Sequence, residues 1–425
     1  MKARDVREAM VESVDVVRRT YPLLALGFLV DAAFLFVFLI VLQSYLPDSL
    51  HASTAVAGYA LATFGAAKLV TQLASGFVSD RLGTRRAMLI GTALLLAADV
   101  SIWPLAHIAP WLIVVSGAVE GLGSSVTWPA VYSAGAARVG ASHKGRFTAL
   151  LTLSTGAALI VGLGGGGVLE YFVSFDVAMV APVVAISVAF ALALLMMPAV
   201  RETPLTAPPE IPTPGRFRAI ISSRDRASFA LLVLAESAAL GALTAAFRAY
   251  GRDVLDVSLT RQAVLLAPAA LLGGALVVPG GAIADRVGAR RVMTAGFATT
   301  GVCLLVLSHW GDAALVAVVA AVAGGAFGLA APSVAATMMS LAGPEGSRGG
   351  VIGWFMTMDG VGHAAGPAAA GLMLGVSGAS AVLLTAGTLF LFVAYIALTS
   401  RLGEGAAEIT PARAGAPTSL IGGQS

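Results

Sequence analysis

A few ionisable residues interrupt long apolar stretches of this sequence. They are Asp31, Lys68, Asp99, Glu120, Glu236, Asp359 and His363. A charge at the centre of a lipid bilayer costs about 2.5–3.5 kcal/mol on insertion scales, so each residue needs a partner or a function. A carboxyl group in such surroundings can exchange protons near neutral pH, and a bound cationic or polar molecule can compete with the proton. These residues are therefore candidates for proton or substrate binding.

Spacing and depth suggest pairs among them. Asp31 and Lys68 each fall about 12–15 Å inside consecutive apolar segments, counted at about 1.5 Å per helical residue, so they can neutralise each other. Asp359 and His363 share one helix face, and because histidine titrates near neutral pH they can relay protons or simply pack polar atoms together. Asp99, one turn before Trp103, is equally compatible with a helix contact.

The whole composition places these residues in a membrane. Of 425 residues, 58% are hydrophobic and 12% charged, against about 25% charged in soluble domains, and the mean hydropathy is +0.89. Cys303 is the only cysteine, which excludes a disulfide framework and a cysteine metal site. We expect no metal and no cofactor.

Apolar segments of membrane-spanning length recur twelve times, and each must be a helix because lipid cannot pair free backbone groups. The segments lie near 22–46, 54–78, 87–107, 110–134, 147–169, 177–198, 228–249, 262–284, 291–310, 313–339, 350–374 and 380–400. The sequence thus predicts an all-α integral membrane protein of twelve transmembrane helices in two pseudo-symmetric six-helix halves.

The basic residues predict the orientation. All 26 Lys and Arg residues fall on one side of this topology except Lys68, Arg248, Arg252 and Arg261, which makes that side and both termini cytoplasmic. The net charge of +3 therefore flanks the membrane and does not indicate nucleic acid. The expected divisions are an N-tail (1–20), an N-terminal bundle (21–198), a Pro-rich linker (199–227), a C-terminal bundle (228–400) and a C-tail (401–425).

One charged stretch occurs twice. GFVSDRLGTRR (76–86) and GAIADRVGARR (281–291) share Gly, Asp, Arg, Gly, Arg and Arg at the same spacing. Gly83 and Gly288 permit a tight reversal, and the arginines hold each loop at an anionic leaflet. A basic loop of any sequence would also satisfy the orientation rule, but two copies in register argue for more.

The repeated stretch resembles the signature loop of the major facilitator superfamily, and its second copy matches that family's duplicated halves. The resemblance implies that the loops latch the cytoplasmic faces together in the outward-open state, and that helices 1, 4, 7 and 10, hence Asp31, Glu120 and Glu236, line a central cavity. The implied latch residues are Gly76, Asp80, Arg81, Gly83 and Arg85, with Gly281, Asp285, Arg286, Gly288 and Arg290.

Small residues on helices 5 and 11 predict close helix packing. GLGGGG (162–167) and GPAAAG (366–371) contain the candidates Gly162, Gly166, Gly366 and Pro367, and Gly362 adds a GxxxG pair. The second stretch resembles the family's antiporter motif, but helix 5 has Leu163 in place of the proline. In helix 4, Gly117 and Glu120 stand where the resembling exporters carry Arg and Gln.

Aromatic residues could line an apolar pocket or simply face lipid and neighbouring helices. These are Phe34, Phe36, Phe38, Trp128, Trp354 and Phe355, with Phe34 and Trp128 the better candidates for the pocket.

Together these features favour a secondary active transporter that works by alternating access and exports a small amphipathic drug or metabolite in exchange for protons. Alternatives are proton-symport uptake or facilitated diffusion of a sugar or organic acid, for which Lys68 would suit an anion, and a membrane-embedded enzyme. No Walker sequence supports ATP-driven pumping. We expect a monomer in a bacterial plasma membrane, with a small molecule, protons and lipid as its partners.

Overall fold

The computed structural model describes residues 3–53, 55–139, 147, 150–158, 161–162, 175–195, 223–341 and 348–400, and this part of the chain is helical and without strands. Helices of the N-terminal half are α1 (Ala3–Leu35), the π-helix η1 (Phe36–Tyr45), α2 (Leu46–Leu50), α3 (Ala55–Leu82), α4 (Thr84–Ile108), the 3-10 helix η2 (Pro110–Leu112), α5 (Ile113–Val139), α7 (Phe175–Ala178) and α8 (Val180–Leu195). Those of the C-terminal half are α10 (Arg224–Asp253), α11 (Leu259–Val287), α12 (Ala289–Leu307), α13 (Ala313–Leu341), α14 (Arg348–Val376) and α15 (Gly378–Thr399).

The helices follow the apolar segments of the sequence closely. Eleven of the twelve expected segments coincide with a helix, while the segment 147–169 lies largely outside the described residues. The main difference is at the start, because α1 begins at Ala3, within the stretch expected as a tail. The linker 199–227 is described only from residue 223, and the C-tail 401–425 lies outside the described residues.

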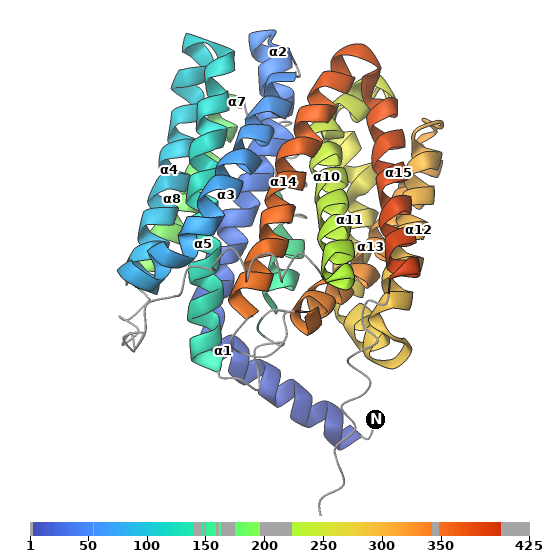
Figure 1. Ribbon diagram of the computed structural model, residues 1–425. Coiled ribbons are helices and arrows are strands. Elements are labelled where there is room, and N and C mark those ends of the chain that lie inside the picture. Colours follow the sequence, from blue (N-terminus) through green and yellow to red (C-terminus); the bar gives the residue numbers. More distant parts are fainter. Residues whose placement is uncertain are drawn as a thin grey trace, which may run out of the picture.

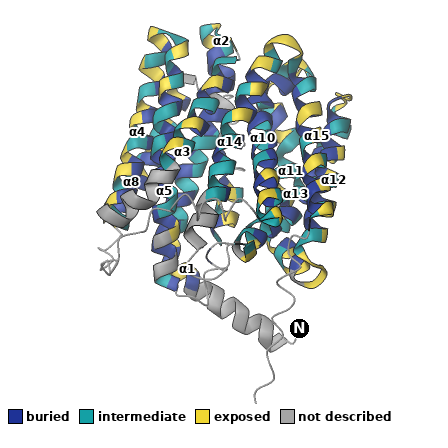
Figure 2. Cartoon of the chain, in the orientation of Figure 1, coloured by how far each residue is buried: buried dark blue, intermediate teal, exposed yellow. Residues whose placement is uncertain are grey.

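Seven of the described helices are long and apolar enough to cross a membrane, and two more are apolar but shorter. Most residues of α10 are buried, whereas few of α11 are, and exposed positions follow the outer faces of the helices (Figure 2). Large apolar side chains such as Leu195 and Val376 are exposed there. A soluble protein rarely exposes so much apolar surface, so these faces suit lipid. The chain is a multi-pass membrane protein.

The same helix crossings recur in both halves. A Cβ added at Gly117 of α5 would collide with the carbonyl oxygen of Ala60 on α3, and a Cβ at Gly324 of α13 would collide with that of Ala269 on α11. One turn further along, Gly121 and Gly328 repeat the pattern. Only glycine permits backbones to approach so closely. The duplication thus extends from the charged loops to the helix contacts.

The two halves meet along α3 and α14, which run side by side in Figure 1. A Cβ at Gly58 would lie 3.1 Å from the Cα of Gly371, and one at Gly360 would lie 3.3 Å from the Cα of Leu69. Between these points Gly65 touches the backbone of Ala364. We call this antiparallel contact of Gly58, Gly65, Gly360 and Gly371 the glycine seam.

A second contact joins the halves at the end of the bundle that carries α2, the upper end in Figure 1. The side chain of Gln43 on η1 donates to the carbonyl of Thr244 and accepts at 2.8 Å from the backbone N–H of Arg248, both on α10. Arg248 is 7% exposed and donates to Val257 O. The loops at Gly83 and Gly288 lie at the opposite end. Among the described residues, the contacts between halves therefore run from the α2 end to the middle of the bundle.

Candidate functional site

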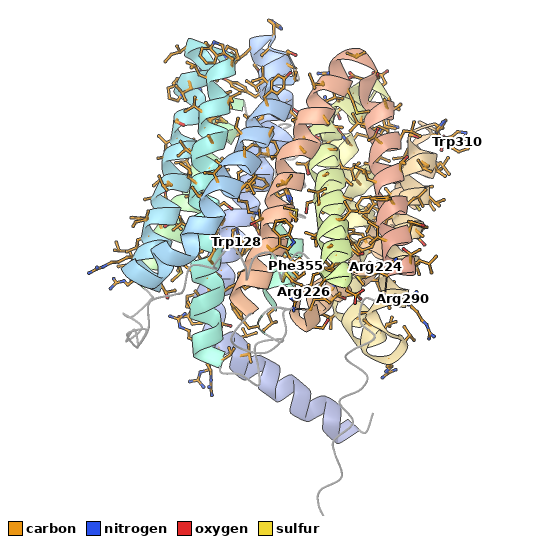
Figure 3. The ribbon with its side chains drawn as sticks, in the orientation of Figure 1. Trp128, Arg224, Arg226, Arg290, Trp310 and Phe355 are labelled. Carbon is orange, nitrogen blue, oxygen red and sulfur yellow. The ribbon has the colours of Figure 1, made fainter. Side chains whose placement is uncertain are left out.

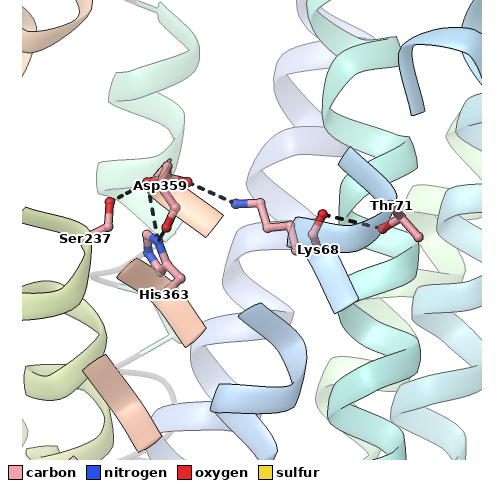
Figure 4. Close-up of polar contacts among 5 residues, drawn as sticks. All are labelled: Lys68, Thr71, Ser237, Asp359 and His363. Carbon is pink, nitrogen blue, oxygen red and sulfur yellow. Dashed lines mark hydrogen bonds and ion pairs between the residues drawn. The ribbon is translucent and has the colours of Figure 1, made fainter. Parts of the chain in front are cut away.

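A polar cluster joins the two halves at mid-bundle (Figure 4). Asp359 of α14 lies 3.6 Å from the Lys68 ammonium of α3 and 3.3 Å from His363 Nδ1, one turn along its own helix. Ser237 of α10 donates a hydrogen bond of 2.5 Å to Asp359 Oδ1. We call Lys68, Ser237, Asp359 and His363 the central cluster. One carboxylate thus accepts contacts from three helices.

The central cluster lies where the glycine seam ends. Asp359 lies directly beyond Gly360 on the side toward the charged loops, whereas Lys68 lies between Gly65 and Leu69, within the seam. Their side chains remain 17% and 28% exposed, and that of His363 27%. These groups are therefore half-buried and reachable by a small ligand or water.

Asp31 of α1 lies near the central cluster but does not pair with Lys68 as the sequence suggested. Its Oδ2 accepts a hydrogen bond of 2.6 Å from Thr155. Lys68 is close enough for its charge to act on Asp31, while its ion pair goes to Asp359 in the other half. Tyr132 of α5 lies within electrostatic reach of both Asp31 and Asp359.

An aromatic group borders the cluster on the N-terminal side. Phe34 and Phe38 stack at 4.6 Å between ring centroids, and Phe34 lies 4.8 Å from Phe64 of α3. The Lys68 ammonium is 6.0 Å from the centroid of Phe64, at the outer limit of a cation–π contact. Apolar ring faces and charged groups thus adjoin at one place, as a site for an amphipathic molecule requires.

The other aromatic candidates lie apart from this group. Trp128 packs beside Gly27 of α1 and Tyr132, and Figure 3 shows it on the N-terminal half. Phe355 is 1% exposed and meets Phe229 edge to face at 4.7 Å. It belongs to the core of the C-terminal half.

Of the two further acids expected in the cavity, only Glu236 is near the cluster. Glu236 precedes Ser237 on α10, is 9% exposed, and lies within reach of the charge of Asp359. Glu120 is 3% exposed and lies close to Asp99 of α4. It therefore faces the interior of its own half.

The charged loops contain two glycines in backbone conformations that other residues avoid. Gly83 has φ 82° and ψ 151°, and Gly288 has φ 95° and ψ 133°. Each ends one helix and starts the next within a single residue. The sequence repeat is thus a repeat of backbone geometry.

The arginines of these loops bind within their own halves. Arg85 donates at 2.8 Å to the carbonyl of Leu194 near the end of α8, and Arg290 donates to that of Leu398 near the end of α15. Arg286 is exposed. Figure 3 shows Arg290 at the same end of the bundle as Arg224 and Arg226, away from Trp310. The side chains of Asp80, Arg81 and Asp285 lie outside the described residues, as do the surroundings of Gly76. A Cβ at Gly281 would make an ordinary contact, at 3.9 Å, with the side chain of Pro332.

The Gly-Pro stretch of α14 packs closely against α10. A Cβ at Gly366 would collide with Ala238 O, and one at Gly362 would lie 2.5 Å from Leu234 O, both on α10. The ring of Pro367 fills the space beside Gly241. Gly162 packs against Leu35 of α1, whereas Gly166 lies outside the described residues.

The α3–α5 crossing also explains the glycine at the place of the exporters' helix 4 arginine. Gly117 lies against the backbone of Ala60, so no side chain of any size fits there. On α3, Lys68 places a cation beside Asp359.

The sequence did not identify Ser237 of the central cluster or its neighbours Thr155 and Tyr132. Uncharged polar residues are common in membrane helices, and nothing in their types marks them. The one available signal was the position of Ser237 directly after Glu236. Among the described residues no group of three His, Cys, Asp or Glu side chains could hold a metal ion.

Comparison with known proteins adds family and fold. The sequence model of the Major Facilitator Superfamily matches residues 24–283 and again 264–422. Uncharacterized MFS-type transporters of Burkholderia mallei (strain SAVP1) and Burkholderia pseudomallei (strain K96243) are 33% identical over 132 residues, which is 29% of this chain and 32% of theirs. The match therefore spans about a third of these relatives.

Solved structures resemble the chain along most of its length. The nucleoside transporter NupG superposes with a TM-score of 0.71 at 14% identity, and a variant of it with 0.73 at 15% identity. The superposition covers 89% of this chain and 98% of the other. At such low identity the likeness is one of fold.

Proposed function

The chain belongs to the major facilitator superfamily, and from this membership we propose that it is a secondary active transporter that works by alternating access and exports a small amphipathic compound in exchange for protons. A transporter of this kind must break and remake contacts between its halves in each cycle. The proposal concerns the mechanism, the coupling ion and the direction.

The observation that carries the proposal is the ion pair between Lys68 and Asp359. It links the halves beside the contact of Gly360 with Leu69, and both side chains remain partly exposed. A ligand that competes for either charge would weaken the link between the halves. Binding would thereby favour one arrangement of the two bundles, which is the thermodynamic requirement for a coupled conformational change.

Protons suit this site because carboxyl and imidazole groups lie together beside one ammonium. His363 adjoins Asp359, and Asp31 lies nearby with a single hydrogen bond from Thr155. Loss or gain of a proton at any of these groups alters the balance of charge around Lys68. We therefore assign proton exchange to Asp31, Asp359 and His363, with Glu236 adjoining them.

The surroundings favour an amphipathic substrate. Phe34 and Phe64 offer apolar faces next to the Lys68 ammonium. Tyr132 adds a hydroxyl group between the acids of the two halves. A molecule with an apolar body and one polar or charged group matches this combination.

The test uses proteoliposomes that contain the purified chain and an imposed pH gradient. We expect substrate-dependent proton movement in the wild type and its loss in Asp31→Asn, because the amide cannot exchange a proton. Asp256→Asn is the matched control, since Asp256 is exposed and its left-handed backbone (φ 50°) suits asparagine. Proton movement that survives Asp31→Asn would contradict the assignment of Asp31.

A second candidate is uptake or facilitated diffusion of a polar metabolite such as a sugar or an organic acid. Lys68 favours it, because an ammonium beside an aromatic group can bind a carboxylate or a ring. The nucleoside transporter among the similar folds adds nucleosides to the compounds worth screening. Substrate entry that is independent of the pH gradient and never exceeds equilibrium would select facilitated diffusion over export.

We further propose that both termini face the cytoplasm of a bacterial cell and that the chain acts as a monomer. The arginine-bearing loops at one end of the bundle support the orientation. The repeated loops would then act as cytoplasmic latches when the halves close at that end.

A further inference from the structure

A second pair of acids lies inside the N-terminal half, away from the central cluster. Asp99 of α4 is 2% exposed and Glu120 of α5 is 3% exposed. Asp99 Oδ2 and Glu120 Oε2 are buried and have no hydrogen-bond partner. An unsatisfied buried acceptor destabilises the folded state, and more so when it is charged, so two of them require an explanation.

The register of the two helices places these acids opposite each other. At one level a Cβ at Gly91 of α4 would lie 2.9 Å from the backbone nitrogen of Thr127 on α5. At the other level Ser101 and Ser116 share a hydrogen bond of 2.8 Å. Because α4 and α5 are antiparallel, Asp99 falls level with Glu120, between these contacts. The charge of Asp99 acts directly on Glu120.

No cation neutralises this pair. Ionisable side chains on α4, α5 and the helices packed against them, within the described part of the chain, are Arg18, Arg19, Tyr21 and Asp31 on α1, Tyr45 on η1, Tyr59 and Lys68 on α3, Arg85, Arg86 and His107 on α4, and Tyr132 and Arg138 on α5. None of them forms a hydrogen bond or ion pair with Asp99 or Glu120. The nearby α8 contributes no ionisable residue.

We propose that Asp99 and Glu120 hold one proton between them and form a protonation site separate from the central cluster. A single shared proton gives the facing oxygens one hydrogen bond and leaves one negative charge in place of two. Few other ligands fit, because a metal ion would need more oxygen atoms than two carboxyl groups supply.

The site adjoins a polar route toward the α2 end of the bundle. The Ser101–Ser116 hydroxyl pair lies next to the acids on that side, and His107 is exposed two turns beyond Asp99 on the same helix face. The inference rests on the proposed proton coupling only for its role in transport, where it adds a second proton position along the N-terminal half.

Infrared difference spectroscopy on the purified full chain, without substrate, tests the site. We expect the neutral-pH spectrum of the wild type to contain one carboxylic-acid C=O band that is shifted or removed by Asp99→Asn and by Glu120→Gln, and that is absent from the double variant. Asp256→Asn should leave the band unchanged. Both amides match the size of a protonated acid, so each variant should fold.

Three results would overturn the proposal. If the wild-type band is twice as intense as the band of each single variant, Asp99 and Glu120 are protonated independently. A band that neither substitution alters means that the proton lies elsewhere. If the band is absent and the spectrum changes when sodium is added, a metal cation occupies the site in place of the proton. These outcomes are independent of transport, so failure of the Asp31→Asn assay and failure of this one can be told apart.

Thermal unfolding at several pH values provides a second measurement. Because the folded chain would hold a proton that the unfolded chain releases at neutral pH, the contribution of the pair to Tm should decrease as the pH rises. The double variant should lose that part of the pH dependence. An unchanged pH profile in the double variant would contradict a proton held by this pair.

Discussion

At the scale of single residues, the ion pair of Lys68 and Asp359 has the clearest measurable consequence. A double-mutant cycle with Lys68→Gln and Asp359→Asn should give a coupling free energy of about 0.5–1 kcal/mol, at the low end for contacting residues because both side chains reach water. The exposed pair Arg252 and Asp253, 34% and 48% accessible, is the control and should show coupling close to zero. Equal coupling in the two cycles would mean that the pair adds nothing to the contact between halves.

Sequence reasoning found most ionisable members of the site and the pair of Asp359 and His363, but not the partner of Lys68. Asp31 and Lys68 stood at similar depths on consecutive helices, which made them plausible partners. The structure pairs Lys68 with Asp359 in the other half, because α3 packs along α14. A contact between halves depends on how two bundles dock, and no local spacing records that. Glu120 illustrates the same limit, since only helix rotation decides that it faces Asp99.

At the scale of helices, the glycine seam predicts a sharp dependence on side-chain size. Gly65→Val should lower Tm and transport, because a Cβ at Gly65 already meets the backbone of His363 and Ala364, and overpacking typically costs about 1–3 kcal/mol. Gly375→Val on α14 is the matched control, since nothing lies within 4 Å of its added Cβ. Equal effects of the two substitutions would show that helix propensity, and not the seam, is responsible.

The helices themselves were largely predictable. Apolar runs of membrane-spanning length determine where a chain must be helical in lipid. The second copy of the GFVSDRLGTRR stretch indicated that the chain has two similar halves. The beginning of α1 was not predictable in this way, because Ala3–Tyr21 carries charges that resemble a solvated tail. Likewise the π-helix η1 has no signature in FVFLIVLQSY, since an apolar run fits either winding.

At the scale of the whole molecule, the two charged loops should lie on one side of the membrane. Thr84→Cys and Ala289→Cys, each made in a Cys303→Ser background, should react with an impermeant reagent from the same side, because the duplicated halves place both residues directly after their loop glycines. The neighbouring positions avoid disturbing Gly83 and Gly288. Labelling from opposite sides would contradict the topology.

Under the proposed mechanism, the arrangement of the halves would correspond to one stage of an alternating-access cycle. The seam and the Gln43 contacts join the bundles at the α2 end, while Arg85 and Arg290 are occupied within their own halves. We infer that the proposed latches act in the opposite arrangement, when the seam has parted and the loop end has closed.

The glycine seam also bears on how the gene can change. Every missense change of one nucleotide in a glycine codon produces a larger residue, so at Gly58, Gly65 and Gly360 a point mutation always adds bulk where two backbones already touch. At these positions we expect no amino-acid replacement to be neutral. In a saturation-mutagenesis library selected for transport, we expect a narrow band of intolerance along α3 and α14 that ends near Lys68 and Asp359.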